Sequence, residues 1–211
     1  MVVWFRVKYP HLVNGVWASS APVNSEVDFA KYKDVMTDAI KRIGGEICFA
    51  TIKNAFQQME NDVVHNNGER IYETFKLCQP LNLTIDVAHF LYENSDTVAG
   101  LVQSHRPGKI EAACHFLYTE TQKGKDDLEA FAAWIRHGDL MCLDMSYKNN
   151  LEKYKNIEWG SVANQQMRQW TYQTCSEFAW FQTSSSENQI FGSLYPVDYF
   201  VMLCKDLYDD T

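Results

Sequence analysis

The chain has 211 residues, of which 46% are hydrophobic, 14% aromatic and 22% charged, and its formal net charge is −8. This composition is typical of one large globular domain or two small ones, and the sequence has no apolar run long enough to cross a membrane. The acidic balance and the absence of a basic patch argue against nucleic acid as a partner and fit a soluble secreted or lysosomal protein.

The first 23 residues combine a helical and an extended pattern. Residues 1–11 read as the end of an amphipathic helix that Pro10 stops, and residues 12–20 read as a turn leading into a short buried strand. A helix followed by a buried strand is half of a parallel βαβ unit, so we expect the other half to lie before Met1. The same residues lack the apolar core and cleavage site of a signal peptide, which indicates a fragment of a longer protein.

Helical periodicity dominates the chain from Val27 onward. Gly44-Gly45 is predicted to end the first helix, and residues 167–182 are predicted to begin as extended or turn structure and to continue as helix. A small polar loop is expected at residues 183–187. The predicted helices cover residues 27–43, 47–64, 70–78, 86–92, 110–117, 128–137 and 199–208. The sequence therefore predicts a piece of α/β sheet followed by a long helical insertion.

Six cysteines are spread evenly along the chain without a Cys-x-x-Cys pair. Zinc sites prefer clustered ligands, so we expect no metal, and we expect no cofactor. The even count favours disulfides and an oxidising compartment, but fifteen pairings are open, as is a set of buried free thiols. The sequon Asn82-Leu-Thr84 agrees with that compartment and makes Asn82 a glycosylation candidate. The cysteines are Cys48, Cys78, Cys114, Cys142, Cys175 and Cys204.

The stretch from Arg168 to Thr183 is rich in aromatic side chains, with Gln, Thr and Glu between them. Such a segment can line a pocket and form hydrogen bonds within it. The alternative is that its aromatic rings form core around Cys175, with Glu177 paired to Arg168. The candidates for a substrate pocket are Trp170, Tyr172, Glu177, Trp180 and Phe181.

Three stretches of the sequence carry a resemblance to a known family. They are Trp4 to Val23, Arg168 to Thr183, and Asn188-Gln-Ile-Phe-Gly192 with the aromatic helix up to Cys204. The first is similar to the helix and strand after the family's nucleophile elbow, and the second to its Trp-Tyr-Gln-x-Cys-x-Glu block. Together they resemble the prolyl-type serine carboxypeptidases, the group of Pro-X carboxypeptidase, dipeptidyl peptidase II and thymus-specific serine protease, and are nearest to the thymus-specific branch.

This resemblance implies an α/β-hydrolase domain interrupted by a helical cap. Residues 1–23 would be a fragment of the hydrolase domain, residues 24–190 the disulfide-linked cap, and residues 191–211 a segment returning toward the hydrolase domain. The full-length protein would be secreted or lysosomal. The resemblance also implies the pairings Cys48–Cys114, Cys78–Cys142 and Cys175–Cys204.

Members of this family use a Ser-Asp-His triad, and the serine of an α/β-hydrolase lies in a Gly-x-Ser-x-Gly elbow. The ten glycines of this chain include no such spacing, so the resemblance places all three catalytic residues outside it. Ser19, Ser20 and the six histidines are therefore given structural roles. The substrate implied is a peptide with proline near one terminus. Thr171 stands where an acid in some members distinguishes amino-terminal from carboxy-terminal trimming, so the end that is trimmed stays open.

Two alternative functions are compatible with these observations. In the first, the chain is part of a serine-type exopeptidase that cleaves next to proline. In the second, it is a non-catalytic protein that binds peptides or forms a homodimer through the cap. Under the first, the isolated chain should leave Val13, Val16 and Trp17 uncovered and should lack a stable, monodisperse fold.

Overall fold

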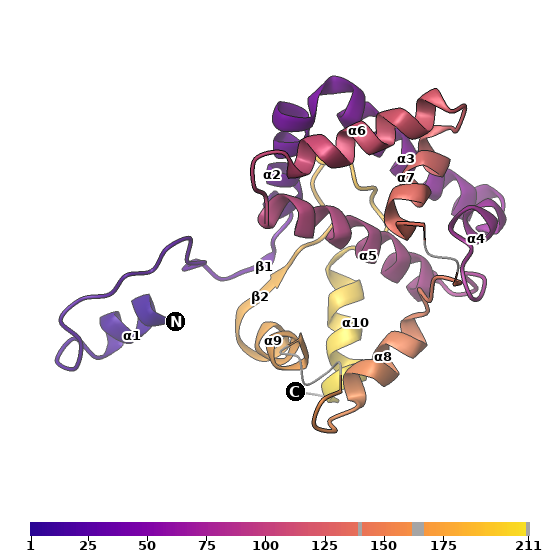
Figure 1. The fold of residues 1–211 in the computed structure, drawn as a ribbon. Coiled ribbons are helices and arrows are strands. Elements are labelled where there is room, and N and C mark those ends of the chain that lie inside the picture. The colour runs from indigo at the N-terminus through magenta and orange to yellow at the C-terminus, as the bar shows by residue number, and fades with distance from the viewer. Residues whose placement is uncertain (139–140, 162–166, 210–211) are drawn as a thin grey trace.

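The computed structural model describes residues 1–138, 141–161 and 167–209. Helices make up most of this part of the chain, and they gather into one body from which the first 25 residues extend to one side (Figure 1). The larger helices are α2 (Lys31–Ala39), α3 (Gly45–His65), α4 (Glu69–Phe75), α5 (Thr84–Gln103), α6 (Lys109–Gln122), α7 (Asp127–Arg136), α8 (Tyr147–Lys155) and α10 (Val197–Tyr208).

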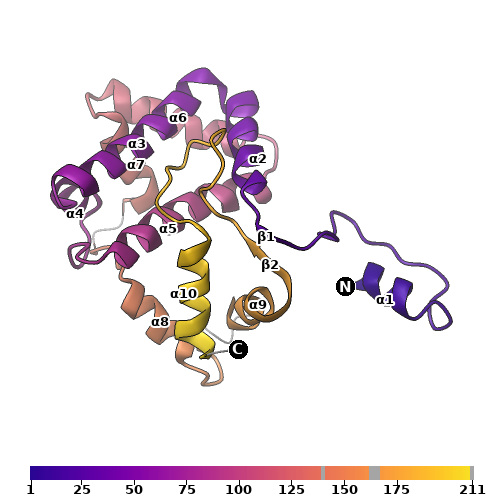
Figure 2. The same ribbon diagram turned by 180° about the vertical axis from the view of Figure 1, so that it is seen from behind.

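The core lies where α3, α5, α6 and α7 pack together. Its centre is aromatic: the ring of Phe56 meets the rings of Phe131 and Phe191 edge to face at 5.5 and 5.3 Å, and all three side chains are fully buried. The segment that joins β2 to α10 passes over this core, as Figure 2 shows from behind, and contributes Phe191 and the fully buried Tyr195. Residues far apart in the sequence therefore share one core.

Local signals agree with the helices that the sequence predicts. Asp126 and Glu129 form a capping box at the start of α7, in which each side chain accepts a backbone N–H bond of the other residue. The predicted helices 47–64 and 128–137 correspond to α3 and α7 within a few residues. Helix α5 is much longer than the predicted 86–92, and α8 was not predicted from the sequence.

Three predictions of secondary structure are wrong, and two of them concern the strands of the small sheet. Val27 does not begin a helix but lies in strand β1 (Glu26–Asp28), which pairs in parallel with β2 (Ala179–Phe181) through the partners Glu26↔Ala179 and Asp28↔Phe181. The stretch 167–182 runs in the opposite order to the prediction: α9 (Met167–Gln173), then the π-helix η3 (Thr174–Phe178), then β2. Pairing with β1, some 150 residues away, sets this order.

The N-terminal segment begins as predicted with α1 (Val2–Lys8), but residues 12–20 do not form the predicted strand. A strand needs a partner for its backbone polar groups, and no described segment pairs with these residues. Their side chains are correspondingly open, because Val16 is 40% and Trp17 92% exposed while Val13 is half-buried.

All six cysteines are paired. The bridges are Cys48–Cys114, Cys78–Cys142 and Cys175–Cys204, which are the pairs that the resemblance implies. Sequence separations of 66, 64 and 29 residues make each bridge worth about 3.5–4.5 kcal/mol in the chain-entropy account. None of the described helices is long and apolar enough to cross a membrane.

Candidate substrate-binding surface

Three aromatic rings from three other elements gather on Trp180, and we call Trp4, Trp170, Phe178 and Trp180 the aromatic stack. Trp170 of α9 stacks on Trp180 with ring centroids 6.0 Å apart and planes inclined by 19°. Phe178 of η3 lies 4.8 Å from Trp180, and Trp4 of α1 lies 6.2 Å from it at 15°. These offset, nearly parallel arrangements are favourable for aromatic pairs.

The backbone around Trp180 is held in an unusual conformation. Ala179 and Trp180 both have positive φ angles, 56° and 53°, which residues with a Cβ atom rarely adopt. The preceding π-helix is also a rare element that is frequent at functional sites. The indole N–H of Trp180 donates to the carbonyl oxygen of Asn24 at 2.7 Å, which fixes the ring relative to the N-terminal segment. This geometry holds the aromatic stack in place at the side of β2.

Exposure separates the five pocket candidates into two groups. Trp180 and Phe181 are each 9% exposed, and Phe181 stacks on Phe200 of α10 at 5.2 Å, so both rings support the surface from below. Trp170 and Tyr172 are each 45% exposed, so a ligand can reach part of each side chain. Glu177 is exposed as well and lies one residue before Phe178. The surface that a ligand can reach therefore centres on Trp170.

Arg168 does not form the alternative pair with Glu177. Its guanidinium donates to the Tyr154 carbonyl oxygen at 2.9 Å and lies 4.9 Å above the ring of Tyr208, whose hydroxyl donates back to the Arg168 carbonyl oxygen. Tyr172 meets Tyr208 edge to face at 5.3 Å. These contacts tie α9 to the end of α10 and leave the Glu177 carboxylate unengaged by Arg168.

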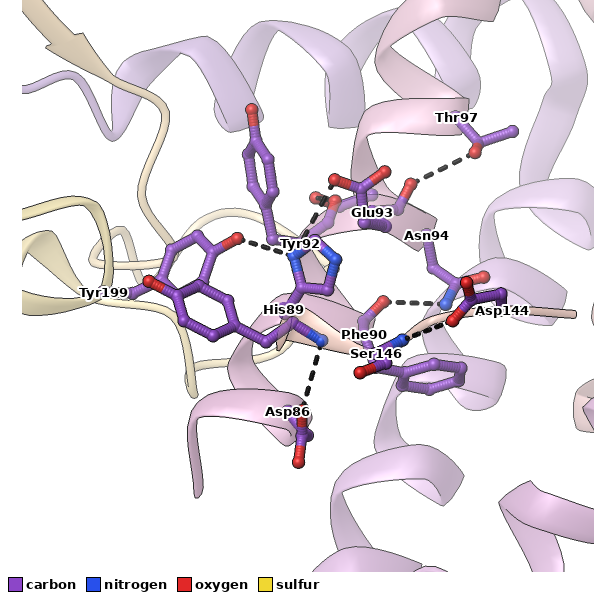
Figure 3. Close-up of polar contacts among 12 residues, drawn as sticks. Asp86, His89, Phe90, Tyr92, Glu93, Asn94, Thr97, Asp144, Ser146 and Tyr199 are labelled. Carbon is purple, nitrogen blue, oxygen red and sulfur yellow. Dashed lines mark hydrogen bonds and ion pairs between the residues drawn. The ribbon is translucent and has the colours of Figure 1, made fainter. Parts of the chain in front are cut away.

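A partly buried polar cluster that was not predicted from the sequence is made of His89, Glu93, Tyr147, Tyr199 and Asp206 (Figure 3 labels His89, Glu93 and Tyr199). His89 Nδ1 lies 2.9 Å from the Tyr199 hydroxyl and 3.9 Å from a Glu93 carboxylate oxygen. The Tyr147 hydroxyl donates to Asp206 at 2.7 Å. The spacing of His89 and Glu93, four residues apart on one helix, was the signal available in the sequence.

The surroundings of this polar cluster shift two pKa values in opposite senses. Burial lowers the pKa of His89 to about 4, against a smaller raising effect of the Asp144 charge. Burial also raises the pKa of Glu93 to about 7, helped by the charge of Asp96 and opposed by that of Lys153. Near pH 6 the histidine is therefore neutral and the glutamate largely protonated. The His89–Tyr199 hydrogen bond joins α5 to α10, and the Tyr147–Asp206 hydrogen bond joins α8 to α10.

Helix α10 is thus fixed from two sides. Tyr199 contacts His89 of α5, and Cys204 is bonded to Cys175 of η3, next to the aromatic stack. Since η3 leads directly into β2, the disulfide transmits the position of α10 to Trp180. The polar cluster and the disulfide together give the exposed aromatic surface a rigid support.

Lys33 is a buried charged residue outside the polar cluster, and its burial was not predicted from the sequence. Its side chain is fully buried, its Nζ atom donates to the Ser95 hydroxyl at 2.8 Å, and four aromatic rings surround that atom at 5.6–5.9 Å. Burial lowers the pKa of Lys33 to about 8, against a raising effect of the Asp96 charge. The surrounding rings belong to Tyr32, Tyr92, Phe191 and Tyr195.

The serines that were considered as catalytic candidates do not lie in the aromatic stack. Ser19 and Ser20 lie exposed in the irregular N-terminal segment. Across residues 1–138, 141–161 and 167–209, no group of three or more His, Cys, Asp or Glu side chains could hold a metal ion. The arrangement can bind an apolar or aromatic group against Trp170, with a carboxylate nearby.

The sequence matches one family profile along its whole length. The profile of serine carboxypeptidase S28 covers residues 1–211, and the chain belongs to this family of serine peptidases. The resemblance stated from the sequence is thereby confirmed.

Individual relatives agree with this assignment. The chain is 28% identical to the thymus-specific serine protease of Mus musculus and 26% identical to that of Homo sapiens, each over 99% of its length. It is 23% identical to the lysosomal Pro-X carboxypeptidase of Bos taurus over 90% of its length. The chain spans 44%, 43% and 40% of these three relatives, respectively. No solved structure matches it.

Proposed function

We propose that the chain is part of a serine-type exopeptidase that cleaves peptides next to proline, and that it supplies the cap and one wall of the substrate site. Membership of the S28 family and similarity to a protein named Pro-X carboxypeptidase support the reaction class. The observation that carries the substrate role is the open face of Trp170, which is held by Trp180 and by the disulfide-anchored η3.

The chemistry of this wall suits a proline residue. A pyrrolidine ring is compact and largely apolar, and it packs well against the flat face of an indole, which excludes water from it. Tyr172 extends the aromatic surface, and Glu177 offers a carboxylate that would attract the free amino terminus of a short peptide. A peptide bound in this way would be held by its proline and by its terminal charge.

The catalytic serine, aspartate and histidine belong, in this proposal, to segments outside the 211 residues. Residues 1–23 would be part of the hydrolase domain, residues 24–190 the cap, and residues 191–211 the return toward the hydrolase domain. The three disulfides fit passage through an oxidising compartment, so a secreted or lysosomal location is part of the proposal.

The second candidate is a non-catalytic protein that binds peptides or dimerises. Trp17 is 92% exposed and Val16 40%, so the N-terminal segment presents apolar side chains, which further strands of the hydrolase domain would cover under the first candidate and a second copy of the chain under the second. A soluble, monodisperse 211-residue chain that unfolds cooperatively would favour this candidate.

The test compares two products of the same gene. The 211-residue chain and a product that includes the coding sequence on both sides are treated with a fluorophosphonate probe, which labels activated serines, and are assayed with fluorogenic prolyl dipeptide and Pro-X substrates. The proposal predicts labelling and turnover for the longer product and neither for the short chain. Flanking sequence without a Gly-x-Ser-x-Gly segment upstream, or without an aspartate and a histidine downstream, would overturn it.

A further inference from the structure

The sequon Asn82-Leu-Thr84 lies beside a polar pocket at the edge of the helical body. Asn82, Leu83 and Thr84 are all exposed, and Asn82 lies in the irregular stretch between α4 and the first residue of α5. An acceptor asparagine must be reached from solvent in such a segment. In both ribbon views α4 lies at the opposite edge of the body from β1 and α9 (Figures 1 and 2). A group attached here would leave the aromatic stack uncovered.

The pocket has a volume of about 290 Å³ and lies between the end of α3 and the start of α4. Its charges are matched internally: Asp62 accepts bonds from the Ile71 backbone N–H and the Asn66 amide, and Arg70 pairs with Asp126. A lining of amides and paired charges suits a neutral ligand with many hydroxyl and amide groups, and it does not suit a free ion. The lining residues are Gln58, Asn61, Asp62, His65, Asn66 and Arg70.

The turn at Gly68 brings Leu81, the residue before the sequon, next to the segment that lines this pocket. Gly68 lies between the lining residues Asn66 and Arg70, and a Cβ atom built on it would be in van der Waals contact, 4.0 Å, with the Cβ of Leu81. Asn82 is the next residue, and consecutive Cα atoms are about 3.8 Å apart. Gly68 has a φ angle of 73°, so the tight turn that brings these two segments together requires glycine.

We propose that Asn82 carries an N-linked glycan and that the first sugars of this glycan lie in the polar pocket between α3 and α4. In the reaction, Asn82 Nδ2 forms a bond to C1 of the reducing-end sugar of a polyprenyl-pyrophosphate oligosaccharide. The C1–oxygen bond to the pyrophosphate breaks, the lipid pyrophosphate leaves, and the amide loses a proton to the transferase. The sugar amide and hydroxyl groups then bond to Asn61 and His65, whose side chains are exposed at the pocket.

The modification is tested on the longer gene product secreted from eukaryotic cells, by mapping the mass of the peptide that contains residue 82. Treatment with peptide N-glycosidase should lower the mass of this peptide in the wild type and convert Asn82 into aspartate. Asn82→Gln and Thr84→Ala should each abolish this mass change, and Thr84→Ser should keep it. A secreted wild-type protein whose peptide mass the enzyme leaves unchanged would overturn the proposal, and the peptidase role would stand unaffected.

The seating of the glycan is tested by its rate of release from the folded protein. Asn61→Ala and His65→Ala should each speed release about fivefold, because each removes one hydrogen bond to the sugar. Gln57→Ala is the matched control, since Gln57 is exposed on the same helix but does not line the pocket. After denaturation all variants should release the glycan at one rate. Equal release rates from folded wild type and both pocket variants would overturn the seating in the pocket.

Discussion

The indole of Trp170 lies on the indole of Trp180, with ring centroids 6.0 Å apart and planes inclined by 19°. One ring is 45% exposed and the other 9%, so the pair has an outer member that a ligand can reach and an inner member that packs. The inner ring is also hydrogen-bonded to the Asn24 carbonyl oxygen. Substitutions of the two tryptophans should therefore have different consequences.

Trp180→Ala should lower the free energy of unfolding by about 3–5 kcal/mol, because it removes a large buried ring and leaves the Asn24 carbonyl oxygen without its donor. Trp159→Ala is the control, since Trp159 is 95% exposed and its removal should change stability by about 0.5 kcal/mol or less. Urea unfolding followed by circular dichroism measures both. Equal midpoints for the two variants would contradict the inner role of Trp180.

Gly44→Ala should destabilise the protein or prevent the Cys48–Cys114 bridge. A Cβ atom at Gly44 would overlap the Sγ atom of Cys114 and lie 3.2 Å from Cys48 Cβ, so the bridge would have to move. Gly100→Ala is the matched control, because Gly100 lies inside α5 with open space around it and alanine favours helix by about 1 kcal/mol. Thermal unfolding and a count of free thiols distinguish the two. A Gly44→Ala protein as stable as wild type, with no free thiol, would refute the packing described.

Lys33→Met should stabilise the protein by about 1–4 kcal/mol at pH 7, since it replaces a buried charge with an apolar chain of similar length. The Ser95 hydroxyl keeps a partner, because it also donates to the Tyr92 carbonyl oxygen at 2.7 Å. Between pH 8 and 10.5 the unfolded lysine holds a proton that the folded one has lost, so wild-type stability rises with pH there.

The advantage of Lys33→Met over wild type should therefore be full below pH 8 and should vanish toward pH 10.5. Lys31→Met on the same helix is the control, because Lys31 is exposed and its replacement should leave stability nearly unchanged at every pH. Urea unfolding midpoints across this range provide the measurement. A constant difference between Lys33→Met and wild type at all pH values would argue against a depressed pKa.

Glu93→Gln should make the protein more sensitive to acid between about pH 6.5 and 4. In this range His89 is protonated in the unfolded protein but neutral in the folded protein. Its contribution to the free energy of unfolding therefore falls as the pH falls. Glu93 acts in the opposite sense between pH 7 and 4.5, because the folded carboxyl binds a proton that the unfolded one has lost. Removing Glu93 removes this compensation.

The measurement is the urea midpoint of wild type, Glu93→Gln and His89→Asn at a series of pH values. The wild type should be nearly flat, Glu93→Gln should lose stability on acidification, and His89→Asn should gain it. Parallel curves for the three proteins would show that the two groups are not titrating as their surroundings indicate.

Much of the fold follows from local patterns in the sequence. Helices α3 and α7 carry uninterrupted helical periodicity, and α7 has its capping box, so both could be predicted. Strand β2 could not, because Ala179 to Phe181 becomes a strand only by pairing with residues 26–28 at the other end of the chain. The predicted strand at residues 12–20 did not form, because no described segment pairs with these residues.

The residues of the candidate site could be predicted from the sequence, but their arrangement in space could not. Composition identified the aromatic stretch, yet the exposure of each ring depends on Trp4 and Asn24, which reach Trp180 from a distant part of the sequence. The burial of Lys33 likewise depends on rings from three separate segments. Long-range contacts of this kind leave no periodic trace that a single sequence would reveal.

The most direct test of the proposed substrate wall is the kcat/KM of the longer gene product for a fluorogenic prolyl substrate, measured for wild type, Trp170→Ala and Trp159→Ala. Loss of the exposed indole face should lower kcat/KM about tenfold through a weaker hold on the proline ring. Trp159→Ala, which removes an exposed indole outside the aromatic stack, should stay close to wild type. Wild-type kcat/KM in a folded Trp170→Ala enzyme would contradict the account.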